Sequence, residues 1–155
     1  MPAPKSVPKS VSSHAAALQL DNQLCFALYS ASLAMTKLYK PLLAPLGLTY
    51  PQYLVMLLLW EHASMSVSGL GERLYLDSGT LTPLLKRMEA AGLLIRKRSS
   101  QDERRVDISL TPAGIELKAG AAKVFACVLR ATASPVSDLV ELTRQVRALR
   151  AQLAI

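Results

Sequence analysis

The chain has 155 residues, of which 51% are hydrophobic, so it suits one domain with a substantial core. No uninterrupted apolar run is long enough to span a bilayer, which argues against a membrane partner. Its formal net charge of +7 fits a polyanionic partner. The chain has two cysteines and two histidines without metal-ligand spacing, so we expect no structural metal site and no cofactor. We expect the protein to be cytoplasmic, because thiols are kept reduced in the cytoplasm.

The N-terminal segment, residues 1–15, is predicted to be a flexible tail. It is rich in Pro, Ser and Lys and lacks the apolar core of a secretion signal. A helical pattern follows from about Ala16 to Leu43, and we assign residues 16–48 to a dimerisation helix. Its apolar residues are spaced four and three apart, the heptad spacing of helices that pack on a partner: Leu24, Leu28, Ala31, Met35, Leu38 and Leu42.

Two shorter helices are predicted next. Thr49 and Gln52 form the sequence signature of a capping box, and the helix that they open runs to about Glu61. Ser66 is the expected N-cap of a second helix, whose inward-facing residues are Val67, Leu70 and Leu74.

The stretch from Asp77 to Gly92 predicts a helix with two different faces. Asp77 or Ser78 can cap its start. The core-facing residues recur at i, i+3, i+4 and i+7: Leu81, Leu84, Leu85 and Met88. Short hydroxyls and cations able to reach phosphates and base edges lie elsewhere on the helix: Ser78, Thr80, Thr82, Lys86 and Arg87. Taken alone, this pattern also fits the solvated face of an ordinary helix.

A basic hairpin is predicted directly after this helix. Val106, Ile108 and Leu110 alternate with polar residues as in a half-buried strand, and residues 95–98 suit an antiparallel partner. The hairpin carries a dense positive charge: Arg96, Lys97, Arg98, Arg104 and Arg105. A helix-turn-helix followed by such a hairpin is a winged helix, which places a helix in the major groove and an Arg in the minor groove. We therefore assign residues 49–111 to a DNA-binding region.

The C-terminal region, residues 112–155, is predicted to hold two further helices. Thr111 is the expected N-cap of the first, which runs to about Thr132, and Ser134 is expected to cap the second. The last helix repeats the heptad spacing at Leu139, Leu142, Val146, Leu149 and Leu153.

The predicted fold class is mainly α with a small β hairpin. It is a winged helix-turn-helix in which the N- and C-terminal helices form a dimerisation region. A homodimer would place two recognition helices about one turn of DNA apart, on an inverted-repeat operator in double-stranded DNA. Packing of the two heptad helices within a single chain is the alternative.

With these residues in view, the chain resembles the MarR-type transcriptional regulators over nearly everything after the tail. The wing has that family's pattern of an Asp, an Arg two residues on, then Val and Leu-Thr, here from Asp102 to Thr111. Within the family it is most similar to the OhrR-type organic hydroperoxide sensors. That similarity rests on Cys25 between Leu24 and Phe26, on three tyrosines, and on a stretch at the recognition helix: Tyr29, Tyr39, Tyr50 and residues 76–86.

This resemblance implies roles for individual residues. Cys25 would be the redox-sensing thiol, hydrogen-bonded by Tyr39 and Tyr50 supplied by the partner subunit. Arg104 would enter the minor groove, with Asp102 orienting it. Cys127 matches the second cysteine of a two-cysteine subgroup, in which it joins the sensing sulfur of the other subunit.

The residues themselves support part of this chemistry. A thiol reacts with peroxide as its thiolate, and a phenol can donate a hydrogen bond to the sulfur without adding charge. Tyr29, one helical turn beyond Cys25, is the only phenol that the local sequence places nearby. Without the resemblance, Cys25 and Cys127 would be read as small packing residues.

The predicted function is a transcriptional repressor, not an enzyme, that senses organic hydroperoxides through Cys25 and then leaves its operator. One alternative is a MarR-type regulator that responds to a small aromatic ligand. A second is a thiol peroxidase, although Asp21, one turn before Cys25, would oppose a thiolate. A third is non-specific DNA packaging, which needs no sensing cysteine.

Overall fold

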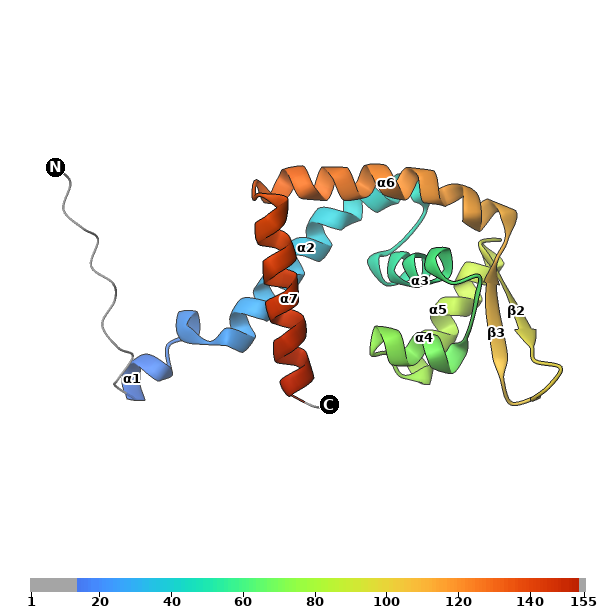
Figure 1. The fold of residues 1–155 in the computed structure, drawn as a ribbon, viewed down its shortest axis with the longest axis horizontal. Coiled ribbons are helices and arrows are strands. Elements are labelled where there is room, and N and C mark those ends of the chain that lie inside the picture. Colours follow the sequence, from blue (N-terminus) through green and yellow to red (C-terminus); the bar gives the residue numbers. More distant parts are fainter. Residues whose placement is uncertain (1–13, 154–155) are drawn as a thin grey trace. The chain divides into compact units, whose positions relative to one another are not determined.

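The computed structural model describes residues 14–153, so most of the predicted tail lies outside the described residues. The chain is mainly helical with one small sheet, as predicted (Figure 1). In chain order the elements are α1 (His14–Ala17), the 3-10 turn η1 (Leu20–Asn22), α2 (Leu24–Leu43), the 3-10 turn η2 (Ala44–Leu46), α3 (Tyr50–Glu61), β1 (Ser64–Ser66), α4 (Val67–Leu74), α5 (Ser78–Ala90), β2 (Leu94–Arg98), β3 (Val106–Leu110), α6 (Pro112–Thr132) and α7 (Val136–Gln152).

Backbone contacts divide the chain into two compact units after Lys37, inside α2. In the first unit, the single helix expected from Ala16 is instead interrupted before α2. The side-chain amide of Asn22 donates to the Ala16 carbonyl at 2.8 Å, and that of Gln23 donates to the Ala17 carbonyl. These bonds occupy carbonyls that would otherwise accept helical N–H groups, so the backbone turns and restarts as α2.

The second unit contains a three-helix group with an apolar core. Each helix start is fixed by a local side chain, as the sequence predicted. Thr49 and Gln52 close a reciprocal capping box on α3, Ser66 accepts from the backbone N–H of Gly69 at 3.0 Å on α4, and Asp77 caps α5. The side chains that fill the centre are completely or almost completely buried: Leu43, Val55, Met56, Leu70, Leu81, Leu85, Met88, Leu94 and Ile108.

The sheet has three antiparallel strands in the order β1-β3-β2, one more than the predicted hairpin. Strand β3 is central, and Ile108 pairs with Met65 on one side and Arg96 on the other. Strand β1 has only three residues, which are too few to show the alternating pattern that predicts a strand. The loop between β2 and β3, which we call the wing loop (residues 99–105), extends away from α4 and α5 (Figure 1).

The start of α6 is tied to the end of α5. Thr111 caps α6 by accepting from the Gly114 N–H at 3.1 Å, and its hydroxyl donates to the Gly92 carbonyl at 2.6 Å. Gly114 packs against the Leu93 backbone so closely that a Cβ there would lie 2.2 Å from the carbonyl oxygen. Trp60 of α3 donates from its indole Nε1 to the Gly114 carbonyl at 3.0 Å.

Helix α7 begins differently from the prediction. Pro135, not Ser134, is its N-cap and provides no side-chain cap. The Ser134 hydroxyl donates back to the Thr132 carbonyl at 3.1 Å, which removes it from the N-terminus of α7. No residue of α7 is buried, and most of its apolar side chains are exposed, including Leu142 and Val146.

No single helix among residues 14–153 is long and apolar enough to cross a membrane. Only α2 with its 3-10 extension, taken together with α3 across a bend, reaches that length and composition.

Candidate functional site

The recognition helix candidate, α5, starts at a well-defined cap. The Asp77 carboxylate accepts from the Thr80 backbone N–H at 2.8 Å and from the Thr80 hydroxyl at 3.2 Å. The backbone hydrogen bond from Thr80, followed by the hydroxyl bond, lowers the pKa of Asp77 below its ordinary value. The sequence left Asp77 and Ser78 open as caps, and the structure selects Asp77. Ser78 then becomes the first helical residue, with its hydroxyl exposed.

The apolar face of α5 is buried as predicted, and its polar face is available. Leu81, Leu84, Leu85 and Met88 are all buried, and the helix runs unbroken through Pro83. Lys86 and Arg87 are exposed, whereas Thr82 is half-buried. Thr80 is exposed, but its hydroxyl is already engaged by the Asp77 cap. A structural role therefore accounts for Thr80 at least in part, which the sequence did not separate from a DNA-contacting role.

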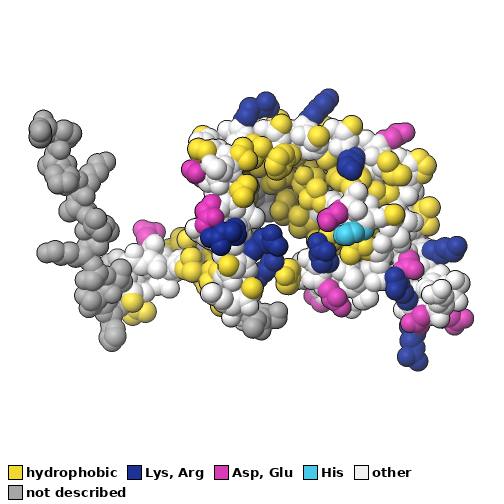
Figure 2. Space-filling view, viewed as in Figure 1, with side chains coloured by type: hydrophobic (Ala, Val, Ile, Leu, Met, Phe, Trp, Pro, Cys, Tyr) yellow, Lys and Arg dark blue, Asp and Glu magenta, His cyan; other side chains and the backbone are white. Residues whose placement is uncertain are grey.

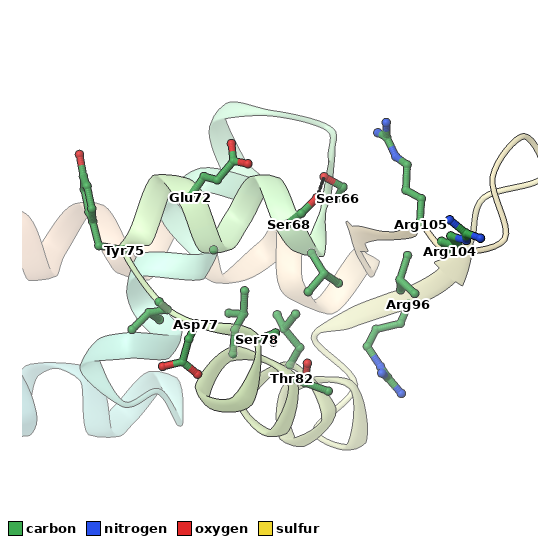
Figure 3. Close-up of a pocket in the computed structure, with 16 residues that line it drawn as sticks. Ser66, Ser68, Glu72, Tyr75, Asp77, Ser78, Thr82, Arg96, Arg104 and Arg105 are labelled. Carbon is green, nitrogen blue, oxygen red and sulfur yellow. Dashed lines mark hydrogen bonds between the residues drawn. The ribbon is translucent and has the colours of Figure 1, made fainter. Parts of the chain in front are cut away.

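A groove of about 740 Å³ lies between α4, α5 and the hairpin, and we call it the α5–wing groove. Ser78 and Thr82 enter it from α5, while Arg96, Arg104 and Arg105 approach from the hairpin side (Figure 3). Tyr75, at the C-terminus of α4, lies at the opposite end from the arginines (Figure 3). Three predicted contact residues, Ser78, Thr82 and Arg104, thus border one concave surface. The other predicted residues do not line it: Thr80, Lys86, Arg87 and Asp102.

The wing loop is organised by its own backbone and by Asp102. The Ser99 N–H donates to the Arg105 carbonyl at 2.8 Å, and the Arg105 N–H donates to the Asp102 carbonyl at 2.9 Å. The Asp102 carboxylate accepts from the Arg104 backbone N–H at 3.0 Å. Asp102 therefore orders the main chain at Arg104 and leaves its guanidinium exposed.

The positive charge of the hairpin is partly balanced. Arg96 pairs with Glu89 at 2.8 Å and Arg105 pairs with Asp107 at 2.7 Å. Within the described residues, the other cations of the hairpin have no acidic partner within ion-pair distance: Lys97, Arg98 and Arg104. Figure 2 shows Lys and Arg side chains gathered over this hairpin, with acidic groups among them. Cations without partners remain available to a polyanion.

The Glu89–Arg96 ion pair was not foreseen from the sequence. It joins α5 to β2, and Glu89 also accepts from the Arg96 backbone N–H at 3.4 Å. The hydrogen bond from the Arg96 side chain lowers the pKa of Glu89 below its ordinary value. The two residues lie in different elements, so the contact depends on the turn between α5 and β2 and not on the periodicity of either.

The proposed sensing residues fall into both units. Cys25 and Tyr29 belong to the first unit, whereas Tyr39, Tyr50 and Cys127 belong to the second. Cys25 is exposed in the single chain. Tyr29 is also exposed.

The structure brings Tyr39 and Tyr50 together and adds Tyr53, which the sequence analysis missed. Their ring centroids are 4.9 Å apart for Tyr39–Tyr50 and 5.7 Å apart for Tyr39–Tyr53. We call these three residues the phenol cluster. The signal was present, because Tyr53 follows Tyr50 by three residues on one helix. Tyr53 also contacts Trp60, with ring centroids 6.5 Å apart.

The phenol cluster stays uncharged over a wide pH range. Burial, and then repulsion from Tyr53 and Tyr50, raises the pKa of Tyr39 to about 12. Burial also raises the pKa of Tyr50, and burial with the neighbouring Tyr50 raises that of Tyr53. Near neutral pH these phenols are therefore hydrogen-bond donors.

The second cysteine lies late in α6. Cys127 is half-buried, and Val124 and Val128, near it in the sequence of α6, are buried. Its sulfur accepts a hydrogen bond from Arg130 Nη2 at 3.2 Å. No group of three His, Cys, Asp or Glu residues in the described part of the chain is arranged to hold a metal ion.

Comparison with known proteins gives a consistent family. Residues 37–120 match the family model described as the transcriptional regulator SarA/Rot. The chain is 56% identical over 125 residues to the organic hydroperoxide resistance transcriptional regulator of Bacillus subtilis, covering 81% of this chain and 85% of that protein.

Solved structures agree with this result. Reduced AbfR bound to DNA matches with a TM-score of 0.72 and 34% identity, over 88% of this chain and 95% of that chain. A disulfide-formed AbfR matches with a TM-score of 0.61 and 36% identity, over 84% of this chain and 91% of that chain. AbfR is a protein of Staphylococcus epidermidis. AbsC, a MarR family regulator from Streptomyces coelicolor, matches with a TM-score of 0.75 and 25% identity, over 88% of this chain and 96% of that chain. The chain therefore belongs to the MarR family of winged-helix transcriptional regulators, in the group that includes the organic hydroperoxide resistance regulator.

Proposed function

We propose that this protein is a dimeric repressor that leaves its operator when an organic hydroperoxide oxidises Cys25. The observation that carries the proposal is its 56% identity to the Bacillus subtilis organic hydroperoxide resistance regulator. A redox switch acting on DNA is supported by the similar AbfR structures, which include a reduced DNA-bound form and a disulfide form.

The DNA-binding region is assigned to residues 49–111. Ser78, Thr82, Lys86 and Arg87 would read bases or hold phosphates in the major groove, with Thr80 fixing the helix start. Arg104, exposed on a main chain ordered by Asp102, would enter the minor groove. The α5–wing groove supports this assignment because Ser78 and Thr82 of α5 and Arg104 of the wing loop all border it.

The dimerisation region is assigned to residues 16–48 and 112–155. Apolar side chains remain uncovered in both segments, with Leu24 60% exposed and Leu142 56% exposed. A second copy that covers these helices would bury this apolar surface. The partner subunit would then supply Tyr39 and Tyr50 to Cys25.

The sensing step transfers one oxygen atom. The Cys25 thiolate attacks the distal oxygen of the hydroperoxide, the O–O bond breaks, and the alkoxide takes a proton to leave as an alcohol. Cys25 becomes a sulfenic acid. The neutral phenols of Tyr39 and Tyr50 would donate to the sulfur before attack, and Tyr29 lies one turn away on the same helix.

The switch would be completed by a disulfide between Cys25 and Cys127 of the other subunit. The Cys127 sulfur attacks the Cys25 sulfenic sulfur, an S–S bond forms, the S–O bond breaks, and water leaves. A covalent link between α2 of one subunit and α6 of the other would then change the spacing of the two wings.

The decisive experiment titrates an inverted-repeat operator from upstream of the gene while fluorescence anisotropy is recorded. Wild type and Cys25→Ser are each measured before and after an equimolar organic hydroperoxide, and again after dithiothreitol. We expect only wild type to lose binding and to regain it with reductant. Binding that persists in both proteins would overturn peroxide sensing.

A second candidate function is induction by a small aromatic ligand. It is favoured by an apolar cavity of about 400 Å³ between α3 and α6, lined by Tyr53, Leu57, Trp60 and Phe125, among others. It predicts that a ligand releases the operator equally from wild type and Cys25→Ser. Thiol peroxidase activity would instead show many turnovers with a reductant, whereas a repressor reacts once per thiol.

A further inference from the structure

Cys127 has an electrostatic setting that differs from simple packing in the core. Arg130, one turn later on α6, places Nη2 3.2 Å from the sulfur. Lys123, one turn before Cys127 on the same helix, adds a second exposed cation. No acidic residue occupies the positions three or four residues away on α6, so no carboxylate on that helix face competes for the guanidinium.

Arg130 is directed to the sulfur and to no described acid. Within the described residues it forms no ion pair, so no carboxylate draws its guanidinium away from the sulfur. A thiol sulfur is a weak acceptor, whereas a thiolate is a strong one for a charged donor. The hydrogen bond from Arg130 to the Cys127 sulfur is therefore strongest when the sulfur carries negative charge.

We propose that Arg130 is a positioning residue for the second half of the redox switch, a role that rests on the proposed function. Its guanidinium holds the Cys127 sulfur and stabilises it as the thiolate that attacks the Cys25 sulfenic acid of the other subunit. The S–S bond forms as the S–O bond breaks, and the hydroxide released takes a proton to become water. The organic hydroperoxide is the only oxidant required, and it has already been reduced to its alcohol.

The first experiment follows disulfide formation after one equivalent of cumene hydroperoxide, with alkylation at each time point and separation on a non-reducing gel. Arg130→Gln should slow the disulfide about tenfold at neutral pH. The difference should shrink as pH rises above about 9, where a thiol ionises without help. Arg130→Lys should recover part of the rate, because it restores a cation without the planar fork.

A matched control separates this effect from general loss of charge. Arg73→Gln removes the same charge from an exposed position on α4, outside the proposed dimerisation region, and should leave the rate unchanged. Equal rates for Arg130→Gln and wild type at all pH values would overturn the proposal. A uniform slowing at every pH would also overturn it, because that pattern indicates altered packing instead of a stabilised thiolate.

A second measurement is independent of Cys25. In a Cys25→Ser background, the neutral reagent iodoacetamide reports the thiolate content of Cys127 by its alkylation rate. Arg130→Gln should slow this reaction at neutral pH, and an unchanged rate would contradict the role of Arg130. Trapping of Cys25 sulfenic acid with dimedone in a Cys127→Ser protein tests the proposed function separately. Its absence would reject peroxide sensing, while the alkylation arm would still decide the role of Arg130.

Discussion

At the scale of single residues, Gly114 is where three parts of the second unit meet. Its N–H is capped by Thr111, its carbonyl accepts from Trp60, and its α-carbon faces the Leu93 backbone. A side chain here has no room, because the obstructing atom is a backbone oxygen and cannot rotate away.

Gly114→Ala should therefore destabilise the fold by about 2 kcal/mol or more, as overpacking against a backbone does. Urea unfolding followed by circular dichroism measures the change. Ala113→Ser, an exposed neighbour in the same turn, should change the free energy of unfolding by less than about 0.5 kcal/mol. Equal stability of Gly114→Ala and wild type would show that the α6 start can shift.

Tyr39 gives a prediction about pH. Its folded pKa of about 12 lies above the ordinary value of 10.0, so folding favours the neutral phenol. This preference stabilises the folded state fully at pH values below 10.0, the ordinary pKa of tyrosine. The stabilisation is lost as the pH rises from 10.0 toward about 12, the pKa of Tyr39 in the folded protein. Tyr39→Phe should thus lose less stability than wild type over that alkaline window.

Urea unfolding at a series of alkaline pH values tests this, together with the ultraviolet absorbance of tyrosinate. The absorbance titration of wild type should contain a late component that Tyr39→Phe lacks. A wild-type titration with no component above the ordinary tyrosine range would contradict the burial of the cluster.

Residue-level prediction from sequence succeeded where the signal was local. The resemblance singled out Tyr39 and Tyr50 as residues that support Cys25, but it did not predict the phenol cluster. Tyr53 and the Glu89–Arg96 pair depend on how helices and strands meet. Thr80 shows a different limit. Its hydroxyl suits DNA and also a helix cap, and only coordinates show that the cap uses it.

At the scale of elements, the important relation is that between α5 and the hairpin. One ion pair, Glu89 with Arg96, connects the recognition helix to β2. It helps to hold the hairpin against α5, together with the pairing of β3 with β1 and the buried side chains of Leu94 and Ile108.

Glu89→Gln should weaken operator binding about threefold to fivefold, because a freer hairpin presents Arg104 less often in the correct place. Thermal stability should hardly change, since the pair is partly exposed. The lowered pKa keeps Glu89 ionised above its ordinary value of 4.5, and the pair is lost only as pH falls below that range. The effect of the substitution should therefore be constant from weakly acidic to weakly basic pH.

Glu116→Gln on α6 is the matched control, because it removes the same charge from an exposed position. Both substitutions raise the net charge, which favours DNA, so the comparison isolates the contact. If Glu89→Gln bound the operator as tightly as Glu116→Gln does, the pair would have no part in DNA binding.

Most helix starts were predicted correctly, because an N-cap side chain bonds a backbone N–H only three residues later. Four consecutive residues therefore contain the signal, as at Thr49, Ser66 and Thr111. The interruption before α2 was missed because its amides reach back six residues to carbonyls. Ser134 was misjudged because a hydroxyl before a proline can bond backward as well as forward.

At the scale of the whole molecule, the proposed dimer relies on the uncovered apolar side chains of α7. Leu142→Asp with Val146→Asp should weaken the proposed dimer at least about tenfold, because a charge would be buried at each position. Both side chains are exposed in the single chain, so the winged helix should remain folded. Analytical ultracentrifugation measures the dissociation constant, and circular dichroism checks the fold.

Ala148→Asp, an exposed position on the other side of α7, is the control and should leave association intact. An unaltered dimer in the double variant would place the interface elsewhere. Operator affinity should fall together with dimer stability, since each monomer would then bind a single half-site.

Trp60 is the only tryptophan of the chain. Its ring touches Tyr53, which in turn contacts Tyr39 and Tyr50, and its indole N–H is held by Gly114. Light absorbed by these tyrosines can pass to the indole, whose emission colour depends on the polarity around it. The protein thus carries an intrinsic optical probe next to the phenol cluster, and stopped-flow fluorescence can follow oxidation and operator release in unlabelled wild type.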